Sequence, residues 1–288
     1  MKFIATKPMK GATQVVFIFG HPLDHTLSPA MHNAAFEKLG MKWLYAPLDI
    51  LPREVGPSVK MMRAFNIRGA NVTVPYKENF SAYLDYVEPE AKWMGSVNTI
   101  YRKGDKLCGT STDGDGFLIS LGSWRSKLKG TKGLLIGAGG AAKAVAGALA
   151  KAGVKGFVVA DLSAPKAVKL RKLILQKYPK IDIQVIPPKD ADKFVPYSDW
   201  IIQATPLGLK GESSPVSLKM ARKGILAVDL IYHRPTDFLR QAKRFGLHPL
   251  NGLGMLLNQG VLSFERWTGR KAPVEVMRRA LLKGLKQR

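Results

Sequence analysis

The chain has 288 residues, of which 46% are hydrophobic and 23% charged, a composition typical of a globular protein large enough for two domains. Its single cysteine, Cys108, excludes an internal disulfide framework and a cysteine-rich metal centre, and is typical of a reducing cytosol. The 45 lysines and arginines against 21 acidic residues give a net charge of +24, which we interpret as a solvated basic surface that favours anionic small molecules.

Neither membrane insertion nor export is expected. Lys143 interrupts the longest apolar run, and the N-terminal residues 1–11 lack the apolar core of a signal peptide. No zinc-finger spacing or aromatic RNA-binding motif accompanies the basic clusters. We therefore expect a cytoplasmic protein, a monomer or homodimer, with no membrane partner and no nucleic-acid partner. A nucleic-acid-binding role for the basic surface remains an alternative, which a salt-dependent gel shift would reveal.

The first part of the chain alternates strands and helices. The expected strands cover 15–19, 45–50 and 67–74, the expected helices cover 31–39, 53–65 and 78–92, and a hairpin joins 97–101 to 106–110. Ser28-Pro29 is a typical N-cap and first-turn pair, so Thr26 and Ser28 are expected at the positive end of the first helix, where hydroxyls suit a carboxylate. Capping alone would also explain Ser28.

A glycine-rich turn follows the strand around Leu134-Leu135-Ile136. Residues 137–142 fit G-x-G-x-x-A, a helix continues to about Lys151, and the next strand, 157–159, is followed by Asp161. In such a βαβ unit the small residues allow backbone to approach a pyrophosphate at the helix N-terminus. The segment therefore predicts a dinucleotide site.

The same alternation continues to the C-terminus. Strands are expected over 183–186, 199–206 and 226–232, and helices over 165–178, 237–245, from about 256, and from Pro273. Alternation of this kind predicts an α/β protein with mostly parallel sheets and right-handed crossovers.

Lys77 and Asp113 are the candidate catalytic pair. Lys77 follows a strand that Pro75 stops, where open α/β sheets bind their ligands, and Asp113 opens a helix after the hairpin. Reduction of a carbonyl needs a proton donor beside the developing alkoxide, and a lysine paired with a carboxylate can serve. The five histidines show no H-x-x-x-H or H-E-x-x-H spacing, so a metal site is not expected. A serine hydrolase is not expected either, because the sequence has no G-x-S-x-G motif.

Taken together, these motifs resemble the shikimate dehydrogenase family, including its quinate/shikimate branch, over nearly the whole chain. The matching segments are HTLSPAMHN (25–33), GANVTVPYK (69–77), GSVNTI (95–100), STDGDG (111–116), GAGGAAKA (137–144), ATPLGL (204–209), DLIY (229–232) and GLGMLLNQG (252–260). Eight segments in order are far more specific than any one of them.

The resemblance implies two domains, a substrate domain made of residues 1–115 plus 256–288 and a Rossmann domain of residues 116–255. It also implies reversible NAD(P)-dependent reduction of 3-dehydroshikimate to shikimate, a step of aromatic amino-acid and chorismate biosynthesis. Quinate and 3-dehydroquinate are the related pair handled by the quinate branch. A quinate-preferring NAD-dependent catabolic enzyme remains an alternative, as does a non-catalytic regulatory module, which would be expected to lose Lys77 or Asp113.

The family's functional residues carry over onto matching positions. Lys77 matches the catalytic acid/base and Asp113 its partner, which also contacts substrate. The remaining expected substrate contacts are Thr26, Ser28, Thr73, Asn98, Tyr232 and Gln259. The expected cofactor contacts are Gly137, Ala138, Gly139, Gly140, Ala141, Asp161, Thr205, Leu230, Gly252 and Met255. No metal ligand is expected.

Two departures from the family pattern bear on specificity. Thr26 replaces a serine and adds a methyl group, which bears on the choice between shikimate and quinate. Asp161-Leu162-Ser163 replaces the Asn-Arg-Thr of NADP-using members. An acidic residue there bonds free ribose hydroxyls and repels a 2′-phosphate, so we expect NAD rather than NADP. In the alternative, Asp161 is only a helix N-cap and Lys166 supplies the cation.

Overall fold

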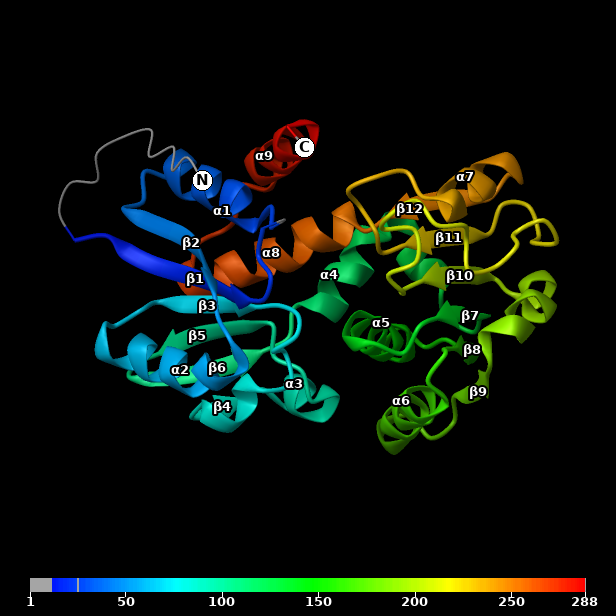
Figure 1. Cartoon of the computed structure of the whole chain (residues 1–288), viewed down its shortest axis with the longest axis horizontal. Coiled ribbons are helices and arrows are strands. Elements are labelled where there is room, and N and C mark those ends of the chain that lie inside the picture. The colour runs from blue at the N-terminus through cyan, green and yellow to red at the C-terminus, as the bar shows by residue number, and fades with distance from the viewer. Residues whose placement is uncertain (1–11, 25, 288) are drawn as a thin grey trace. The chain divides into compact units, whose positions relative to one another are not determined.

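The structure, a computed structural model, describes residues 12–24 and 26–287. The chain divides into two compact units (Figure 1), the first comprising residues up to Thr112 and from Gly260 onward, the second Asp113–Gln259. The expected fold class is confirmed, because the sheet of the first unit is mixed but has three parallel pairings among its five, and that of the second unit is all parallel. Among the described residues, no helix is both long and apolar enough to cross a membrane.

The first unit is built on a six-stranded sheet of order β2-β1-β3-β5-β6-β4. Strands β1, β2 and β3 are parallel, whereas β5 is antiparallel to both β3 and β6. The elements are β1 Gln14–Gly20, α1 Ser28–Lys38, β2 Trp43–Asp49, α2 Val55–Ala64, β3 Gly69–Val72, β4 Tyr86–Val87, α3 Pro89–Met94, β5 Thr99–Lys103, β6 Lys106–Thr110 and α9 Val274–Lys286. Helix α8, Leu253–Thr268, runs from the second unit into the first.

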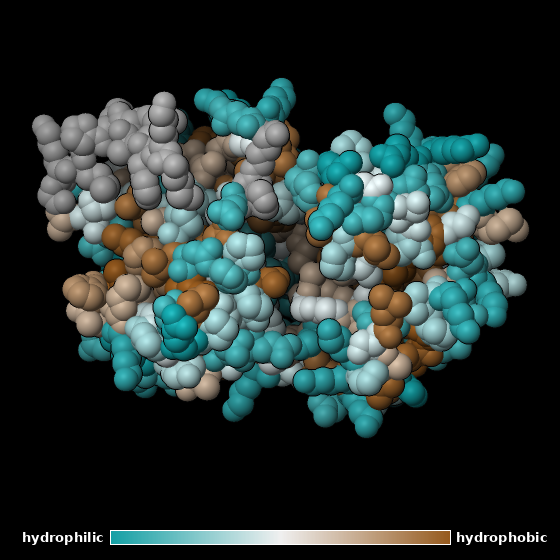
Figure 2. Space-filling model, viewed as in Figure 1, coloured by the Kyte–Doolittle hydropathy of each residue, from teal (hydrophilic) through white to brown (hydrophobic). Residues whose placement is uncertain are grey.

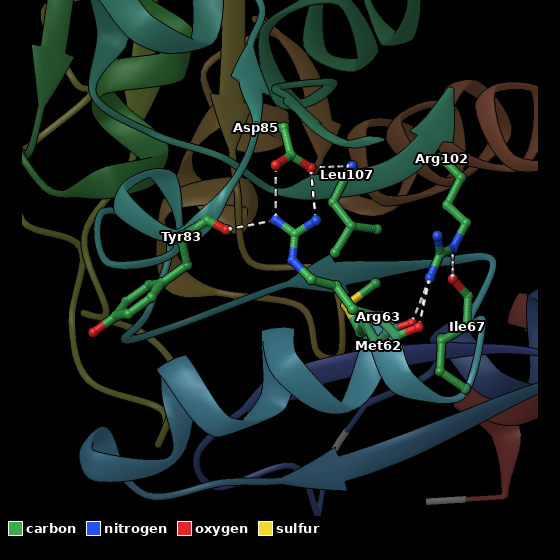
Figure 3. Close-up of polar contacts among 7 residues, drawn as sticks. All are labelled: Met62, Arg63, Ile67, Tyr83, Asp85, Arg102 and Leu107. Carbon is green, nitrogen blue, oxygen red and sulfur yellow. Dashed lines mark hydrogen bonds and ion pairs between the residues drawn. The ribbon is translucent and has the colours of Figure 1, made fainter. Parts of the chain in front are cut away.

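Two arginines fasten α2 to the sheet (Figure 3). Arg63 donates to both oxygens of Asp85 at 2.8 and 3.0 Å, and the amide of Leu107 donates to the same carboxylate at 2.7 Å. These bonds hold the pKa of Asp85 below its usual range. Arg102, on β5, donates to the carbonyls of Met62 and Ile67 at 2.6 and 2.8 Å, so its guanidinium satisfies backbone oxygens at the end of α2.

The predicted helix over 78–92 is wrong. A 3₁₀ turn at Phe80–Tyr83, the two-residue β4 and the short α3 take its place. Pro89 starts α3 and cannot sit inside a longer helix, because it lacks an N–H and holds the residue before it in extended backbone. The Glu88 carboxylate accepts hydrogen bonds from Tyr101 and Thr110, both at 2.7 Å, and so binds this segment to the sheet.

The second unit has an all-parallel sheet of order β12-β11-β10-β7-β8-β9. Its elements are α4 Asp113–Ser120, β7 Lys132–Ile136, α5 Gly140–Lys151, β8 Gly156–Ala160, α6 Ala164–Lys177, β9 Asp182–Ile186, β10 Trp200–Gln203, β11 Leu226–Asp229, α7 Asp237–Arg244 and β12 His248–Asn251. The strand order reverses between β7 and β10, which is where doubly wound sheets bind ligands at the carboxyl ends of their strands. Strand β12 was not predicted, because Pro249 and its exposed neighbours lack strand periodicity.

Helix α1 buries a histidine among aromatic rings. His32 is fully buried, its ring lies 4.5 Å from Tyr45 and 5.0 Å from Trp267 between centroids, and neither ring nitrogen has a hydrogen-bond partner. Burial without a compensating partner lowers the pKa of His32 to about 3, because the charged imidazolium would lose its hydration. His32 is therefore neutral in the native protein.

Because of His32, the folded protein should become less stable as the pH is lowered below ~6.5. Below pH ~6.5 the unfolded chain binds a proton at His32 that the folded chain does not, so each further pH unit down to about 3 lowers the free energy of unfolding by up to ~1.4 kcal/mol. When the free energy of unfolding is measured with urea between pH 4 and 7, His32→Leu should reduce its slope against pH by up to ~1.4 kcal/mol per pH unit, the contribution of one proton. Replacement of the exposed His248 by Gln is the control, and an equal slope in parent and His32→Leu would contradict the assignment.

Candidate functional site

The carboxyl edge of the second unit's sheet carries most of the predicted cofactor residues. Gly137, with φ at +112°, directly follows β7, and a side chain there would approach the Ala204 carbonyl oxygen at 2.9 Å and the Thr205 methyl at 3.2 Å. Gly137 therefore permits the ends of β7 and β10 to meet at the point where strand order reverses.

The glycine loop leads into the N-terminus of α5. Gly139 is the N-cap residue, and a side chain on Gly139 or Gly140 would meet nothing within 4 Å, so the loop faces open space. The first-turn N–H groups of a helix have no intrahelical acceptor and lie at its positive end. An exposed row of such donors, free of side chains, fits the pyrophosphate of a dinucleotide.

Asp161 joins this loop to the next helix. One carboxylate oxygen accepts the Ala138 amide at 2.6 Å and the other accepts the Ser163 amide at 2.7 Å. Ser163 is the N-cap of α6, and its side chain makes no capping bond. The carboxylate thus fixes the loop and the start of α6 together, and its remaining lone pairs can accept ribose hydroxyls. Leu162 beside it is 92% exposed.

The segments that follow β10, β11 and β12 also lie close to one another. Buried Gln203 accepts the Thr205 amide and donates to the Leu207 carbonyl at 2.8 Å, so it shapes the turn after β10. A side chain on Gly252 would overlap the Leu230 carbonyl, so glycine allows the segments after β11 and β12 to touch. Met255 lies in the first turn of α8 and is partly buried. Thr205, Leu230 and Gly252 thus follow adjacent strands along one edge.

In the first unit the loop before α1 contains Thr26 and Ser28. The prediction that Ser28 is the N-cap is wrong: α1 begins at Ser28, Leu27 precedes it, and no side chain caps the helix. Thr26 accepts the Ser28 amide at 3.3 Å, and Ser28 itself is only 4% exposed. The Ser28 hydroxyl therefore does not serve as the cap of α1.

Thr73 and Lys77 lie in the turn that follows β3. The Thr73 amide donates to the Phe19 carbonyl at 2.8 Å, and a side chain on Gly20 would collide with the Thr73 methyl. The Val97 amide donates to the Lys77 carbonyl at 2.8 Å, which sets the half-buried Lys77 beside the residues that lead into β5. Thr73, Lys77 and Asn98 therefore share one end of the sheet.

Asn98 is held by a buried polar network. Its side-chain oxygen accepts the Thr112 amide at 2.8 Å and the Thr99 hydroxyl at 2.9 Å, and its amide nitrogen donates to the Thr112 hydroxyl at 2.9 Å. Asn71 donates to the Asn98 carbonyl and to the Ser263 hydroxyl, each at 3.1 Å, and accepts the Tyr45 phenol at 2.8 Å. The network connects Tyr45 to Asn98 through Asn71.

Burial also fixes the direction of these bonds. Asn71 must turn its NH₂ toward the Asn98 carbonyl, so its oxygen faces Tyr45 and the phenol donates. Burial raises the pKa of the Tyr45 phenol, which remains a donor at neutral pH. Tyr45, Asn71 and Ser263 were not predicted; the available signal was a polar residue inside an otherwise apolar strand, as in Gly69–Val72.

Three predicted residues belong to the second unit. Asp113 is the first residue of α4 and 5% exposed, Tyr232 follows β11 and is partly buried, and Gln259 lies on α8, where its amide donates to the Leu256 carbonyl at 2.8 Å. A side chain on Gly116 would meet the Gln259 backbone at 2.6 Å, so α4 and α8 cross closely at this glycine. Among the described residues, no group of three or more potential ligands could hold a metal ion.

Family models match almost the whole chain. Residues 18–100 match the shikimate dehydrogenase substrate binding domain, residues 121–231 match shikimate / quinate 5-dehydrogenase, and residues 252–282 match the shikimate 5′-dehydrogenase C-terminal domain. The chain belongs to the shikimate dehydrogenase family. The resemblance seen in the sequence is thereby confirmed.

Relatives of this family align from end to end. Shikimate dehydrogenase (NADP(+)) of Desulforamulus reducens is 42% identical over 282 residues, covering 96% of this chain and 97% of its own. Shikimate 5-dehydrogenase of Listeria monocytogenes, solved with shikimate and NAD, is 34% identical with a TM-score of 0.90 over 96% and 99% of the two chains. Quinate dehydrogenase of Corynebacterium glutamicum, solved with NAD, is 26% identical with a TM-score of 0.88 over 94% and 99%.

Removal of the Asn71 side chain should destabilise the first unit of the protein. Asn71→Ala leaves the buried Tyr45 phenol without its acceptor and removes the side-chain bonds to the Asn98 carbonyl and the Ser263 hydroxyl, so the free energy of unfolding should fall by ~2–4 kcal/mol. Chemical denaturation measures this loss. Asn79→Ala, at an exposed position, should change the same quantity by less than ~0.5 kcal/mol, and equal effects of the two substitutions would refute the network.

Proposed function

We propose that this chain interconverts 3-dehydroshikimate and shikimate with NAD as its preferred cofactor, and that Lys77 and Asp113 carry the proton transfer. Membership of the shikimate dehydrogenase family makes the chain a nicotinamide-dinucleotide-dependent oxidoreductase of the shikimate pathway. The single observation that carries the site assignment is that Thr73, Lys77 and Asn98 all belong to one end of the first unit's sheet.

The substrate is a carboxylate with ring hydroxyls, and the first unit offers groups for both. The hydroxyls of Thr26 and Ser28, at the N-terminus of α1, suit the carboxylate because the helix end is positive there. The Asn98 amide, oriented by Thr99 and Thr112, suits a ring hydroxyl. Thr73 adjoins Lys77, and we assign it, with Gln259 and Tyr232 of the second unit, further contacts to the ring and the carboxylate.

The bound dinucleotide supplies the hydride for the carbonyl carbon. Lys77 gives the proton that the developing alkoxide requires and takes it back in the reverse direction, which is the role of a general acid and base. We assign Asp113 the role of the partner carboxylate in the reaction, which can accept a hydrogen bond from a substrate hydroxyl. Both residues are retained, which is not what a non-catalytic descendant of the fold would be expected to show.

The cofactor is assigned to Gly137–Ala141, Thr205, Leu230, Gly252 and Met255, with Asp161 at the adenosine ribose. The Asp161 carboxylate and the apolar Leu162 offer no cation to a 2′-phosphate, and this supports NAD. Against it, the curated relatives at about 40% identity are named as NADP(+) enzymes. Lys166, in the first turn of α6, is the residue that would serve a 2′-phosphate instead.

Quinate is the second candidate substrate. The quinate dehydrogenase of Corynebacterium glutamicum, which is similar over 94% of this chain, was solved with NAD. Thr26 adds a methyl group to a half-buried position beside the Ser28 amide. This favours a change in the fit of the substrate's carboxylate-bearing carbon, where quinate and shikimate differ.

Loss of Lys77 should abolish turnover while leaving substrate binding. Lys77→Ala removes the proton donor, so kcat with shikimate should fall by ~10²- to 10⁴-fold, with little change in KM. Steady-state kinetics measure both values. Lys92→Ala, an exposed lysine on α3, should behave as the parent does. A Lys77→Ala protein with near-parental kcat would overturn the catalytic assignment.

Cofactor preference should follow residues 161 and 162. The parent should have a higher kcat/KM with NAD than with NADP, and Asp161→Asn with Leu162→Arg should raise the NADP-to-NAD ratio by at least ~10-fold through a new charge-assisted bond to the 2′-phosphate. Shikimate and quinate should each be assayed with both cofactors. Strong preference of the parent for NADP would refute the role of Asp161, and inactivity with shikimate under every condition would refute the proposed function itself.

A further inference from the structure

The second unit concentrates positive charge at the amino ends of its parallel strands. Residues 116–181 contain thirteen lysines and arginines but a single acidic residue, Asp161, which lies at the opposite, carboxyl edge of the sheet. At the amino edge, the Lys155 amide donates to the Thr131 carbonyl at 2.8 Å, and the Asp182 amide donates to the Lys155 carbonyl at 3.1 Å. The beginnings of β7, β8 and β9 are therefore side by side.

Two hollows open at this edge. One of about 410 Å³ is lined by Gly122, Arg125, Ser126, Lys129 and Ala152. The other, of about 330 Å³, is lined by residues 150, 153, 154 and 177–181. The turn between α5 and β8 separates them, and Gly153 in that turn faces the Lys129 stem, where an added side chain would lie 3.5 Å from Cγ. The two hollows thus adjoin, with Arg125 and Lys129 on one side and Lys177 and Lys180 on the other.

Local carboxylates do not neutralise this edge. Asp182 pairs with Lys132 at 2.8 Å and Asp199 with Arg222 at 2.6 Å, so both acids already have cations. Within the described part of the chain, the exposed side chains of Arg125, Lys129, Lys155 and Lys180 have no ion-pair partner. The lysines and arginines of α6 are also exposed, and Figure 2 shows hydrophilic side chains over that helix, along the lower rim of the view.

Exposed cations that lie this close together repel one another. A ligand with regularly spaced negative charges lowers that repulsion when it binds. Each phosphate that meets a lysine or arginine releases condensed counterions, which drives binding at low salt. A flexible single strand can follow two adjoining hollows divided by a turn and bring its phosphates to the cations on either side. The partly buried Tyr178 lines one hollow, with the Lys177 ammonium 5.8 Å from its ring centroid, so an aromatic ring and a cation for a base and its phosphate lie together.

We propose that this surface, which we call the amino-edge surface (Arg125, Lys129, Lys155, Lys177, Tyr178 and Lys180), binds single-stranded nucleic acid through its phosphate backbone. The proposal replaces the expectation from the sequence that no nucleic-acid partner exists. Because the dinucleotide loop lies at the other edge of the same sheet, nucleic acid and cofactor occupy separate places on the second unit.

The test compares two charge-reversal variants with the same change in net charge. Lys129→Glu/Lys155→Glu/Lys180→Glu alters the amino-edge surface, and Lys60→Glu/Lys103→Glu/Lys271→Glu alters exposed lysines of the first unit. Fluorescence anisotropy with a labelled single-stranded RNA of about 20 nucleotides, titrated over a series of salt concentrations, measures the affinity of each. Oxidation of shikimate by both variants, at the parental rate, checks that they are folded.

The amino-edge variant should lose at least ~10-fold in affinity for the RNA. The slope of log K against log salt concentration should become less steep by about two, because each of the three lost phosphate contacts contributes ~0.7 to that slope. The first-unit variant should lose less than ~3-fold, because long-range charge is screened. Equal losses would mean that only net charge matters and would overturn the proposal. So would absence of RNA binding by the parent at low salt, including the case in which it binds phosphatidylserine vesicles instead.

Discussion

The side chain of Asn71 is the contact on which the first unit depends. It accepts one hydrogen bond and donates others within a buried space, and its partner Ser263 lies 192 residues away in the sequence. A buried amide with unsatisfied groups would cost more than its bonds gain, so loss of any member of the network destabilises the unit. The bond to Ser263 ties residues from Gly260 onward to the N-terminal sheet, in a unit that is discontinuous in the sequence.

The second unit was largely predictable because its signals are local. A glycine turn between strand 132–136 and helix 140–151 needs only neighbouring residues to be recognised, and the structure has those elements within a few positions. The order of its strands also follows from general rules for right-handed crossovers. Strand β12 escaped prediction because His248 and Pro249 are exposed and only pairing with β11 makes the segment a strand.

The first unit was less predictable because its bonds are long-range. Ser28 has the residue type of an N-cap, yet α1 begins at Ser28 itself and no side chain caps the helix. Residues 78–92 have helical composition, yet Asp85 and Glu88 accept hydrogen bonds from β6, which hold the segment against the sheet. Pro89 then begins a separate short helix, α3. The positions of Lys77 and Asn98 were foreseen, but the residues that orient Asn98 were not, since no local pattern marks them.

Leu162 has a consequence for how this protein can change over time. Its side chain is 92% exposed and adjoins Asp161, whose two bonds are made through backbone amides. Exchange of a side chain that contacts so little has almost no effect on folding stability. Leucine and arginine codons of the CUN and CGN series differ by one base. A leucine codon of the first series therefore becomes an arginine codon in one step, and the substitution leaves the core untouched, so residue 162 is open to selection independently of the fold.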